Sequence, residues 1–433
     1  MKIQQVSPTD IPQVASQLKR TIEPDTSCMA RVQDILTQVR LQGDKAIRAF
    51  TLAYDGVDLQ SFRVTTEEVL QAYDQVPSDY IDILKRSRAN IQQFHLRQKT
   101  SSWSFSPQEG VITGQLVRPL SAVGVYIPGG RATYPSSVLM NVIPAQIAGV
   151  DRIVLFTPPS RDGTISPSVL VAADQLGIKE IYKIGGAQAV AAAAYGTETI
   201  PAVDKITGPG NQYVATAKQL VFGTIDIDMI AGPSEILVLA DDQANSRFIA
   251  ADLLAQGEHD PQAAMILVTP SSALIGQVAL EVEKQKEKLQ RKSILEESCT
   301  NHLWALEVAD MQVGIDLTNA LAPEHLEIMT HTPERVLDQI QHAGSIFLGP
   351  WTPEALGDYY AGPNHTLPTA GTARFSSPLG VYDFIKRPTY ITYSEEALSK
   401  VSRDVQQFAL LEGLDGHAQA IEVRLDSSTN TVD

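Results

Sequence analysis

The first hundred residues carry a helical pattern of apolar positions. Ile81, Leu84, Ile91 and Phe94 recur at roughly the 3.6-residue period of an α-helix. Residues 65–68 read Thr-Thr-Glu-Glu, in which the first threonine and the last glutamate can cap a helix start reciprocally. After a short N-terminal arm, we therefore predict helices over residues 28–97.

From Val123 the pattern changes to short apolar runs that end near Gly or Pro. The runs occupy residues 123–128, 152–156 and 180–184, and helical segments at 137–148, 168–176 and 187–195 alternate with them. Such alternation predicts βαβ units and a parallel sheet covered by helices on both faces.

A second series of apolar runs follows at residues 236–240, 264–268 and 345–348, again with helical segments between them. The break between the two series falls near Ala231–Ser234. The chain is therefore predicted to be α/β, with two parallel-sheet modules.

The last fifty residues contain one clear amphipathic helix. Its apolar stripe consists of Leu398, Val401, Val405, Phe408 and Leu411. Gly413 is placed to end this helix. An apolar face at the end of a chain requires another surface to cover it, such as a second subunit.

Composition narrows the class of protein. A chain of 433 residues with 43% hydrophobic content can bury large cores and fits two or three domains. Its net charge of −16 opposes binding to nucleic acid or to an anionic membrane, so neither is expected as a partner. We expect a cytoplasmic protein, because no run approaches the ~18 apolar residues of a membrane span and the first residues lack a signal-peptide apolar region.

Cys28 and Cys299 are the only cysteines, and neither lies near a histidine motif. Two reduced thiols are the expected state. A zinc–thiolate site or a cysteine nucleophile is therefore disfavoured, and a metal in this protein would take nitrogen and oxygen ligands.

Four short stretches hold four of the 8 histidines beside carboxylates or carboxamides. They are residues 256–259 (Gln-Gly-Glu-His), 323–325 (Pro-Glu-His), 358–365 (Asp-Tyr-Tyr-Ala-Gly-Pro-Asn-His) and 412–417 (Glu-Gly-Leu-Asp-Gly-His). This combination of groups is what a metal site with an adjacent base requires.

Each stretch also has a structural interpretation. Gln256 and His259 lie three residues apart at a predicted helix end, where they could share a metal or simply face solvent. Glu324 and His325 follow a proline before a short helix or turn, and they suit a proton relay or an ordinary surface pair. The loop of residues 356–365 could approach a ligand or form turns.

Three glycine-rich turns follow strand-like runs, at residues 128–131, 185–188 and 208–211. Because ligands bind beyond the carboxyl ends of parallel strands, Tyr126, Gln188 and Asn211 could meet in one pocket. Simple tight turns explain the same glycines, and no glycine fingerprint of a nucleotide site occurs in the chain.

At these residues the chain resembles the histidinol dehydrogenase family over nearly its whole length. The resemblance rests on eight stretches in family order, at residues 123–130, 184–189, 207–211, 230–235, 255–259, 322–326, 357–365 and 412–417. It implies two incomplete Rossmann-like parallel-sheet domains, with an N-terminal helical part and a C-terminal helical tail.

The resemblance also implies the chemistry. Family members are homodimeric zinc enzymes with shared active sites that use two NAD to oxidise L-histidinol through L-histidinaldehyde to L-histidine. The implied zinc ligands are Gln256, His259, Asp358 and His417, the last from the neighbouring subunit. The implied substrate contacts are these four together with Ser234, His325, His365 and Glu412, and the implied NAD contacts are Tyr126, Gln188 and Asn211.

The domain division expected from pattern and resemblance has four parts. They are an arm (1–24), a helical lead-in (25–122) packing with residues 235–378 as a first α/β domain, a second α/β domain on the NAD side (123–234), and a tail (379–433) exchanged between subunits.

In this scheme His325 takes the alcohol proton and Glu324 activates the water that hydrates the aldehyde. A zinc hydrolase with Glu324-activated water is the alternative, and an amino-acid-binding protein on two α/β lobes is a third. A hydrolase has no use for the three predicted NAD loops, and a binding protein has no need for Glu324 and His325.

Overall fold

The computed structural model of the protein describes residues 1–18, 26–129 and 133–426. Within these ranges the chain forms two compact units. Unit 1 comprises Met1–Gln98 and Leu120–Phe384, and unit 2 comprises Lys99–Pro119 and the chain from Ile385 onward. Residues 19–24 of the predicted arm and part of the predicted turn at 128–131 lie outside the described residues.

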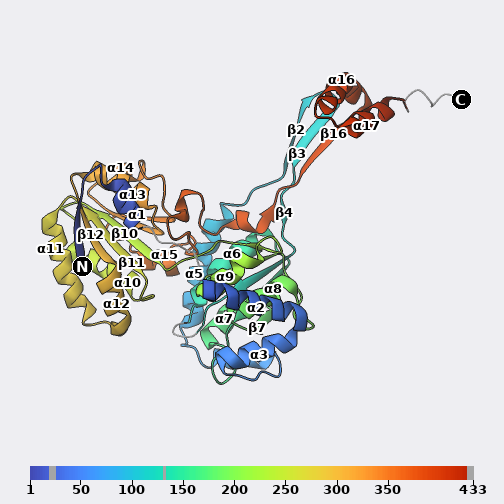
Figure 1. Cartoon of the computed structure of the whole chain (residues 1–433). Coiled ribbons are helices and arrows are strands. Elements are labelled where there is room, and N and C mark those ends of the chain that lie inside the picture. Colours follow the sequence, from blue (N-terminus) through green and yellow to red (C-terminus); the bar gives the residue numbers. More distant parts are fainter. Residues whose placement is uncertain (19–25, 130–132, 427–433) are drawn as a thin grey trace. The chain divides into compact units, whose positions relative to one another are not determined.

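A six-stranded parallel sheet forms the centre of one lobe of unit 1, in the order β1-β12-β11-β10-β13-β14 (Figure 1). The strands are β1 (Lys2–Val6), β10 (Glu235–Ala240), β11 (Ala264–Thr269), β12 (Leu303–Val308), β13 (His325–Met329) and β14 (Ser345–Leu348). Helices α10 (Ser246–Gly257), α11 (Ser272–Lys286) and α12 (Lys292–His302) pack on one face, and α1 (Ile11–Leu18), α13 (Met311–Leu321) and α14 (Pro333–Leu337) on the other. The second predicted strand series is confirmed.

The start of the predicted arm is an edge strand of this sheet. In β1, Lys2 is paired with Trp304 and Val6 with Val308. The Lys2 ammonium donates to the Asn301 carbonyl at 2.7 Å and lies 5.0 Å from the centroid of the Trp304 ring. Residues 2–6 of the predicted arm therefore pair with the six-stranded sheet.

A five-stranded parallel sheet forms the centre of the other lobe, in the order β7-β6-β5-β8-β9. The strands are β5 (Ala122–Tyr126), β6 (Arg152–Thr157), β7 (Glu180–Lys183), β8 (Lys205–Thr207) and β9 (Asp226–Ile227). One face packs against α2 (Thr26–Gln42), α3 (Asp44–Asp55), α8 (Gly186–Tyr195) and α9 (Gln212–Val221), and the other against α4 (Thr66–Tyr73), α5 (Tyr80–Leu96), α6 (Pro135–Ala148) and α7 (Pro167–Gln175). The first predicted series is confirmed, and burial on both faces explains its near-continuous apolar runs.

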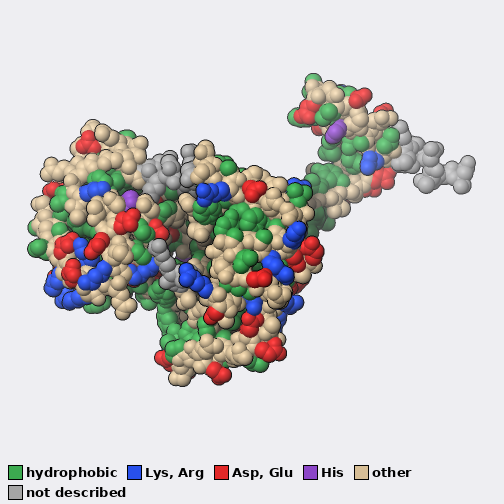
Figure 2. All heavy atoms as spheres, turned by 60° about the horizontal axis from the view of Figure 1, so that its bottom comes forward, with side chains coloured by type: hydrophobic (Ala, Val, Ile, Leu, Met, Phe, Trp, Pro, Cys, Tyr) green, Lys and Arg blue, Asp and Glu red, His purple; other side chains and the backbone are tan. Residues whose placement is uncertain are grey.

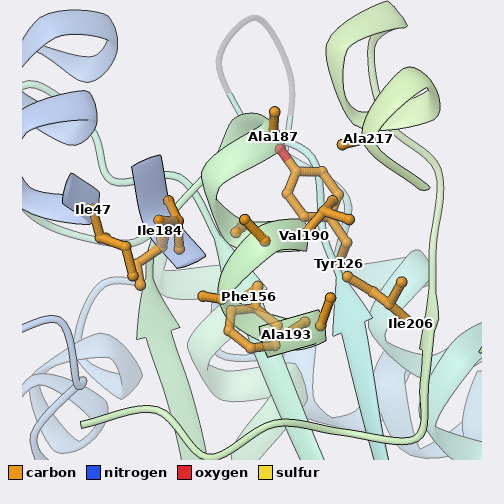
Figure 3. Packing of buried hydrophobic residues seen from close by; sticks show 14 of the residues in the cluster. Ile47, Tyr126, Phe156, Ile184, Ala187, Val190, Ala193, Ile206 and Ala217 are labelled. Carbon is orange, nitrogen blue, oxygen red and sulfur yellow. The ribbon is translucent and has the colours of Figure 1, made fainter. Parts of the chain in front are cut away.

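The predicted N-terminal helices are present, and Thr65 and Glu68 form the expected capping box. Their packing partner differs from the expectation. Ile47 of α3 lies against the core of the five-stranded sheet, with Phe156 and Ile184 (Figure 3). The expected packing of residues 25–122 with 235–378 is thus corrected, because the apolar faces of α2 to α5 cover the five-stranded sheet.

A buried ion pair fixes the loop between β8 and α9. The Lys218 ammonium contacts the Asp228 carboxylate, and their side chains are 3% and 1% exposed. Lys218 also donates to the Gly208 carbonyl at 3.0 Å, and Asp228 accepts from the Gly208 N–H at 2.8 Å. Both polar groups of Gly208 are therefore satisfied by one charged pair, which holds the start of the predicted turn at 208–211.

Unit 2 is built from antiparallel strands and two helices. Its three-stranded sheet has the order β16-β3-β2, and β15 pairs with β4. The elements are β2 (Trp103–Gln108), β3 (Val111–Gln115), β4 (Arg118–Pro119), β15 (Ile385–Lys386), β16 (Thr389–Tyr393), α16 (Glu395–Leu411) and α17 (Asp415–Asp426). The predicted C-terminal helix is confirmed as α16. The strands at 103–119, inside the expected helical lead-in, and the second helix α17 were not predicted.

Two short 3-10 helices, at Thr372–Arg374 and Val381–Phe384, complete the described structure after α15 (Glu354–Tyr359). None of the helices in the described ranges is long and apolar enough to cross a membrane.

Candidate metal and proton-transfer site

The amino-terminal edge of the six-stranded sheet carries most of the predicted site residues. Glu235 and His325 begin β10 and β13, where Ile236 pairs with His325. Ser234 immediately precedes β10, and its carbonyl accepts from the Ala264 N–H at 3.0 Å. Because α10 runs back along the sheet after β10, its last turn also reaches this edge. The site is thus assembled at the opposite edge from the one where open α/β sheets usually bind ligands.

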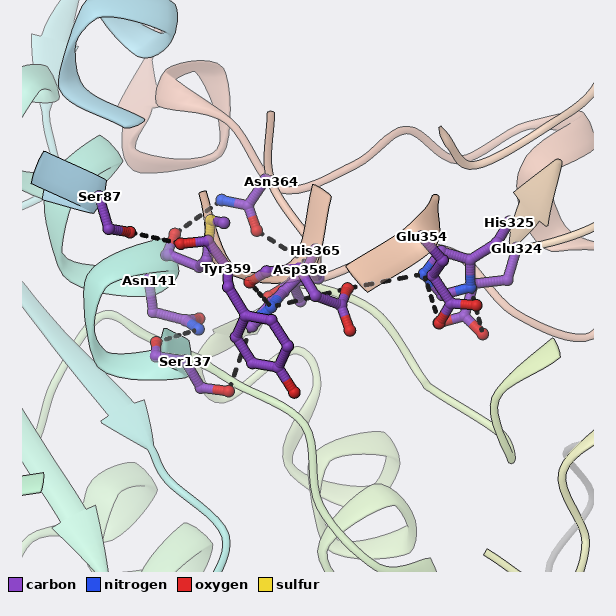
Figure 4. A network of polar contacts seen from close by, with 12 residues as sticks. Ser87, Ser137, Asn141, Glu324, His325, Glu354, Asp358, Tyr359, Asn364 and His365 are labelled. Carbon is purple, nitrogen blue, oxygen red and sulfur yellow. Dashed lines mark hydrogen bonds and ion pairs between the residues drawn. The ribbon is translucent and has the colours of Figure 1, made fainter. Parts of the chain in front are cut away.

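His325 is a buried imidazole with one nitrogen directed at carboxylates. Its Nδ1 lies 2.9 Å from the Glu235 carbonyl, so Nδ1 carries the hydrogen and Nε2 keeps its lone pair. Nε2 lies 3.8 Å from Oε1 of Glu354 and 4.0 Å from Oδ1 of Asp358 (Figure 4). Among the described residues Nε2 has no hydrogen-bond partner. Burial lowers the pKa of His325, which keeps the ring neutral and able to accept a proton.

Glu324 is held by the backbone beside this imidazole. Its Oε2 accepts from the Glu235 N–H at 2.7 Å and lies 3.6 Å from Nδ1 of His325. The expected short helix or turn after Pro323 is wrong, because His325 already pairs within β13. The strand fixes the directions of both side chains, which a turn would not.

The carboxylates around Nε2 form a group that could hold a metal. One ligand atom from each of His259, Glu354 and Asp358 lies within 4.8 Å of the other two. His259 follows α10, and the two carboxylates lie four residues apart on α15, so they share one face of that short helix. Burial raises the pKa of Glu354 well above its ordinary value, and the Asp358 charge adds to the shift. A cation would relieve this repulsion.

Gln256, at the end of α10, completes the group. It is fully buried, and its amide oxygen faces the Glu354 carboxylate. If the amide is turned, its nitrogen donates to Oε1 of Glu354 at 2.5 Å and its oxygen accepts from the Glu235 N–H at 2.7 Å. If the amide is not turned, its oxygen faces a carboxylate oxygen of Glu354, and a cation or a proton is required between the two oxygens. An oxygen donor set with one imidazole suits Zn²⁺.

Glu354 was missed in the sequence analysis. Its position relative to Asp358 is the i, i+4 spacing of ligands on one helix face, and that spacing could have identified it. The helix is only six residues long and follows a Pro, so its pattern is too short to be recognised from apolar periodicity.

The loop after α15 is fixed by hydrogen bonds within itself and to helix α6, which covers the five-stranded sheet. His365 Nδ1 lies 2.9 Å from the Asp358 carbonyl, and its Nε2 lies 3.3 Å from the hydroxyl of Ser137 in α6. Asn364 donates to the Met140 carbonyl at 2.6 Å. Burial lowers the pKa of His365, so this ring is also neutral. Asp358 and His365 are therefore brought together at this loop, with 4.0 Å between Oδ1 of Asp358 and Nδ1 of His365.

The three predicted cofactor-binding residues lie at the carboxyl edge of the five-stranded sheet. Tyr126 ends β5, and its buried hydroxyl accepts from the Gly186 N–H at 3.1 Å (Figure 3). Gln188 is 1% exposed in the first turn of α8, and Asn211 caps α9 by accepting from two backbone N–H groups. Tyr126 and Asn211 thus make structural hydrogen bonds here, and the use of the three residues for a cofactor stays a prediction.

A cavity of about 360 Å³ opens at the same edge. It is lined by the segments that follow β5 and β6, including Gly129, Thr157 and Arg161, and by Asp55 at the end of α3. Its volume lies in the ordinary range of ligand pockets. Its lining includes Pro128 and Gly129 of the predicted turn at 128–131.

Glu412 and His417 lie in unit 2, where they line one open cavity with apolar residues of α16 and α17. Figure 2 shows hydrophobic side chains gathered over these helices. Phe408 is 68% exposed and Leu411 is 87% exposed. The two predicted site residues are thus brought to one hollow across the turn that contains Gly413.

Comparisons with known proteins agree with one another. The family model described as histidinol dehydrogenase matches residues 18–425. The histidinol dehydrogenase of Halalkalibacterium halodurans is 52% identical over 410 residues, which cover 94% of this chain and 97% of that one. The enzyme of Bacillus subtilis (strain 168) is 53% identical over 408 residues, or 94% and 96% of the two chains. The crystal structure of histidinol dehydrogenase from Elizabethkingia anophelis superposes with a TM-score of 0.93 at 37% identity and covers 99% of both chains.

Proposed function

Because the chain belongs to the histidinol dehydrogenase family and is an oxidoreductase, we propose that it oxidises L-histidinol to L-histidine through L-histidinaldehyde. Each of the two oxidations reduces one NAD. The observation that carries the proposal is the neutral imidazole of His325, whose Nε2 has no hydrogen-bond partner in the described part of the chain and faces Glu354 and Asp358.

We propose zinc as the metal. Gln256, His259 and Asp358 would hold it, with His417 supplied by a second copy of the chain, and Glu354 lies close enough to contribute an oxygen. The mixture of carboxylate, amide and imidazole donors supports this choice, and no thiol is needed. When bound, zinc would fix the imidazole and amine of the substrate beside the bases.

His325 acts as the base of the first oxidation. With Nδ1–H donated to the Glu235 carbonyl, Nε2 is free to take the alcohol proton while hydride leaves for NAD. Ser234, His365 and Glu412 are proposed as further substrate contacts, together with the metal-binding residues. Tyr126, Gln188 and Asn211 are proposed as NAD contacts, reached when their loops adjust around the cofactor.

Glu324 acts in the second oxidation. Its carboxylate is fixed by the Glu235 N–H, beside the imidazole, where it can take a proton from the water that adds to the aldehyde. The hydrate then transfers the remaining hydrogen on that carbon to the second NAD as hydride. The location proposed for this biosynthetic enzyme is the cytoplasm.

The proposal is tested by the ratio of NADH formed to L-histidinol consumed on zinc-loaded protein. We expect a ratio near two that is lost after chelation of the metal. Glu324→Gln should lower the ratio toward one, because hydration of the aldehyde is slowed while the first oxidation continues. A wild-type ratio of one would mean that the aldehyde is released, and a ratio of zero would contradict the dehydrogenase in favour of the hydrolase or the binding protein.

We further propose a homodimer with shared sites. The exposed apolar side chains of α16 and α17, around Glu412 and His417, support a partner surface on unit 2. Mixing inactive His417→Ala and Gln256→Ala proteins should restore about a quarter of the wild-type activity, because half of the reassorted dimers are mixed and each contains one complete site. Measured activity that stays at the level of the separate variants after subunit exchange would exclude shared sites.

A further inference from the structure

Helix α5 carries a row of residues that contacts the segment after α15. Ser87, Asn90 and Phe94, called here the α5 row, are spaced three and four residues apart and share one face of the helix. Leu84 and Ile91, on an adjacent face, pack in the core under the five-stranded sheet. Helix α5 is therefore anchored in one lobe by its apolar residues, and the α5 row is available to hold another part of the chain.

The carboxyl end of α15 receives two hydrogen bonds from this row. The Ser87 hydroxyl donates to the Tyr359 carbonyl at 2.5 Å (Figure 4). The Asn90 amide donates to the carbonyl of the next residue, Tyr360, at 2.9 Å. The last carbonyls of a helix have no partners within the helix, so they must be satisfied from outside it. Helix α5 supplies the donors for two of them in succession.

The loop that follows α15 lies directly against the same helix. Gly362 has a φ of 116°, and a Cβ atom added to it would lie 2.9 Å from the Asn90 carbonyl oxygen and 3.2 Å from Cβ of Phe94. Real Cβ atoms essentially never come within 3.0 Å of backbone, so this contact requires glycine. Nε2 of the buried His95 lies 3.4 Å from the amide nitrogen of Asn364. Helix α5 thus holds the segment after α15 at four places.

We propose that Ser87 and Asn90 are positioning residues for Asp358, one of the residues that would hold zinc. Asp358 immediately precedes Tyr359, so a shift at the end of α15 moves its carboxylate. Helix α15 has six residues, too few to form a stable helix without contacts from the rest of the protein. The inference rests on the proposed function, because it concerns the orientation of a proposed metal ligand.

The test is the affinity of the protein for zinc, measured by competition with a chelating dye. Replacing both Ser87 and Asn90 with alanine should raise the dissociation constant about 10- to 100-fold, the usual contribution of groups that orient metal ligands. Each single variant should show a smaller increase. Saturating zinc should restore most of the activity of the double variant, because the metal-binding residues themselves are intact. The matched control is Gln93→Ala, which removes a carboxamide from an exposed position of α5 and should leave the affinity unchanged.

Cobalt in place of zinc gives a readout that a purely structural role would not change. Co²⁺ accepts nitrogen and oxygen ligands, and its visible absorption bands depend on the geometry of those ligands. The cobalt-loaded double variant should show altered bands, whereas those of Gln93→Ala should coincide with the wild type. Alanine is a better helix former than serine or asparagine, so α5 should remain folded in the double variant, and the melting temperature verifies this.

The outcomes separate this inference from the proposed function. If the wild type binds zinc and the double variant keeps both its zinc affinity and its cobalt bands, the positioning role is refuted and the proposed metal stands, whatever happens to the melting temperature. Equal weakening of zinc binding by Gln93→Ala would also refute the role of the two hydrogen bonds. If the wild type binds neither metal, the proposed zinc site is wrong, and this inference is wrong with it.

Discussion

Replacing His325 with asparagine should lower kcat for NADH formation about 10²- to 10⁴-fold, the usual contribution of a positioned general base. The asparagine amide can still donate to the Glu235 carbonyl, as Nδ1 of the imidazole does at 2.9 Å. What disappears is Nε2, the nitrogen directed at the carboxylates of α15. The loss should therefore appear in kcat, with a smaller change in KM for L-histidinol.

Steady-state kinetics of the zinc-loaded variant provide the measurement. His331→Asn is the matched control, since the His331 side chain is exposed and only its backbone N–H is engaged, with Asp241. The control should retain wild-type activity. Rates within threefold of the wild type for His325→Asn would assign the proton transfer to another group. Metal content determined for both variants distinguishes loss of the base from loss of the metal.

Replacing Lys218 with methionine should destabilise unit 1 by about 3–5 kcal/mol, because removing one partner of a buried pair leaves the other charge uncompensated. The remaining carboxylate is Asp228, whose side chain is 1% exposed. Methionine matches the length of the lysine stem, so the loss comes mainly from the charge. The carbonyl of Gly208 would lose its donor as well.

Urea unfolding at pH 7 measures this change, and Lys286→Met is the control. Lys286 pairs with Glu283 at 2.8 Å, but Glu283 is 65% exposed, so that pair should contribute no more than about 1 kcal/mol. Adding Asp228→Asn to Lys218→Met should recover part of the lost stability. A loss below about 1 kcal/mol for Lys218→Met would show that water reaches the pair.

Sequence patterns identified β5, β6, β7, β10, β11 and β14 from their apolar runs. They missed β1, β12 and β13 of the six-stranded sheet, whose apolar residues are interrupted by polar or charged ones. Strands β8 and β9 were not predicted because they have only three and two residues. Their positions are set by pairing with β5 and with each other and by the loop at Gly208. Strands β2, β3 and β16 escaped because most of their residues alternate weakly or are exposed. The sheet against which α2 to α5 pack was not predicted correctly, because an apolar helix face does not specify which sheet it covers.

The candidate site was predicted where its chemistry is local in sequence. Gln256 with His259, Glu324 with His325, and Asp358 with His365 each appear as a short polar motif, and the structure brings the members of each pair into one region. Glu354 and Asp55 were missed because their meaning depends on residues far away in the chain. A single carboxylate at the end of a helix matches no sequence motif, so its position in a site becomes apparent only from the residues around it in the structure.

The edge position of β1 has a consequence for synthesis on the ribosome. Lys2 donates to the carbonyl of Asn301, which lies 299 residues later in the chain. At bacterial rates of translation, β12 is therefore synthesised roughly 15–60 s after its neighbour β1. The elements of the five-stranded lobe, from α2 to β9, are complete long before then. Strand β1 therefore leaves the ribosome long before its partner β12, and a nascent chain carries it as an unprotected β-edge throughout that interval.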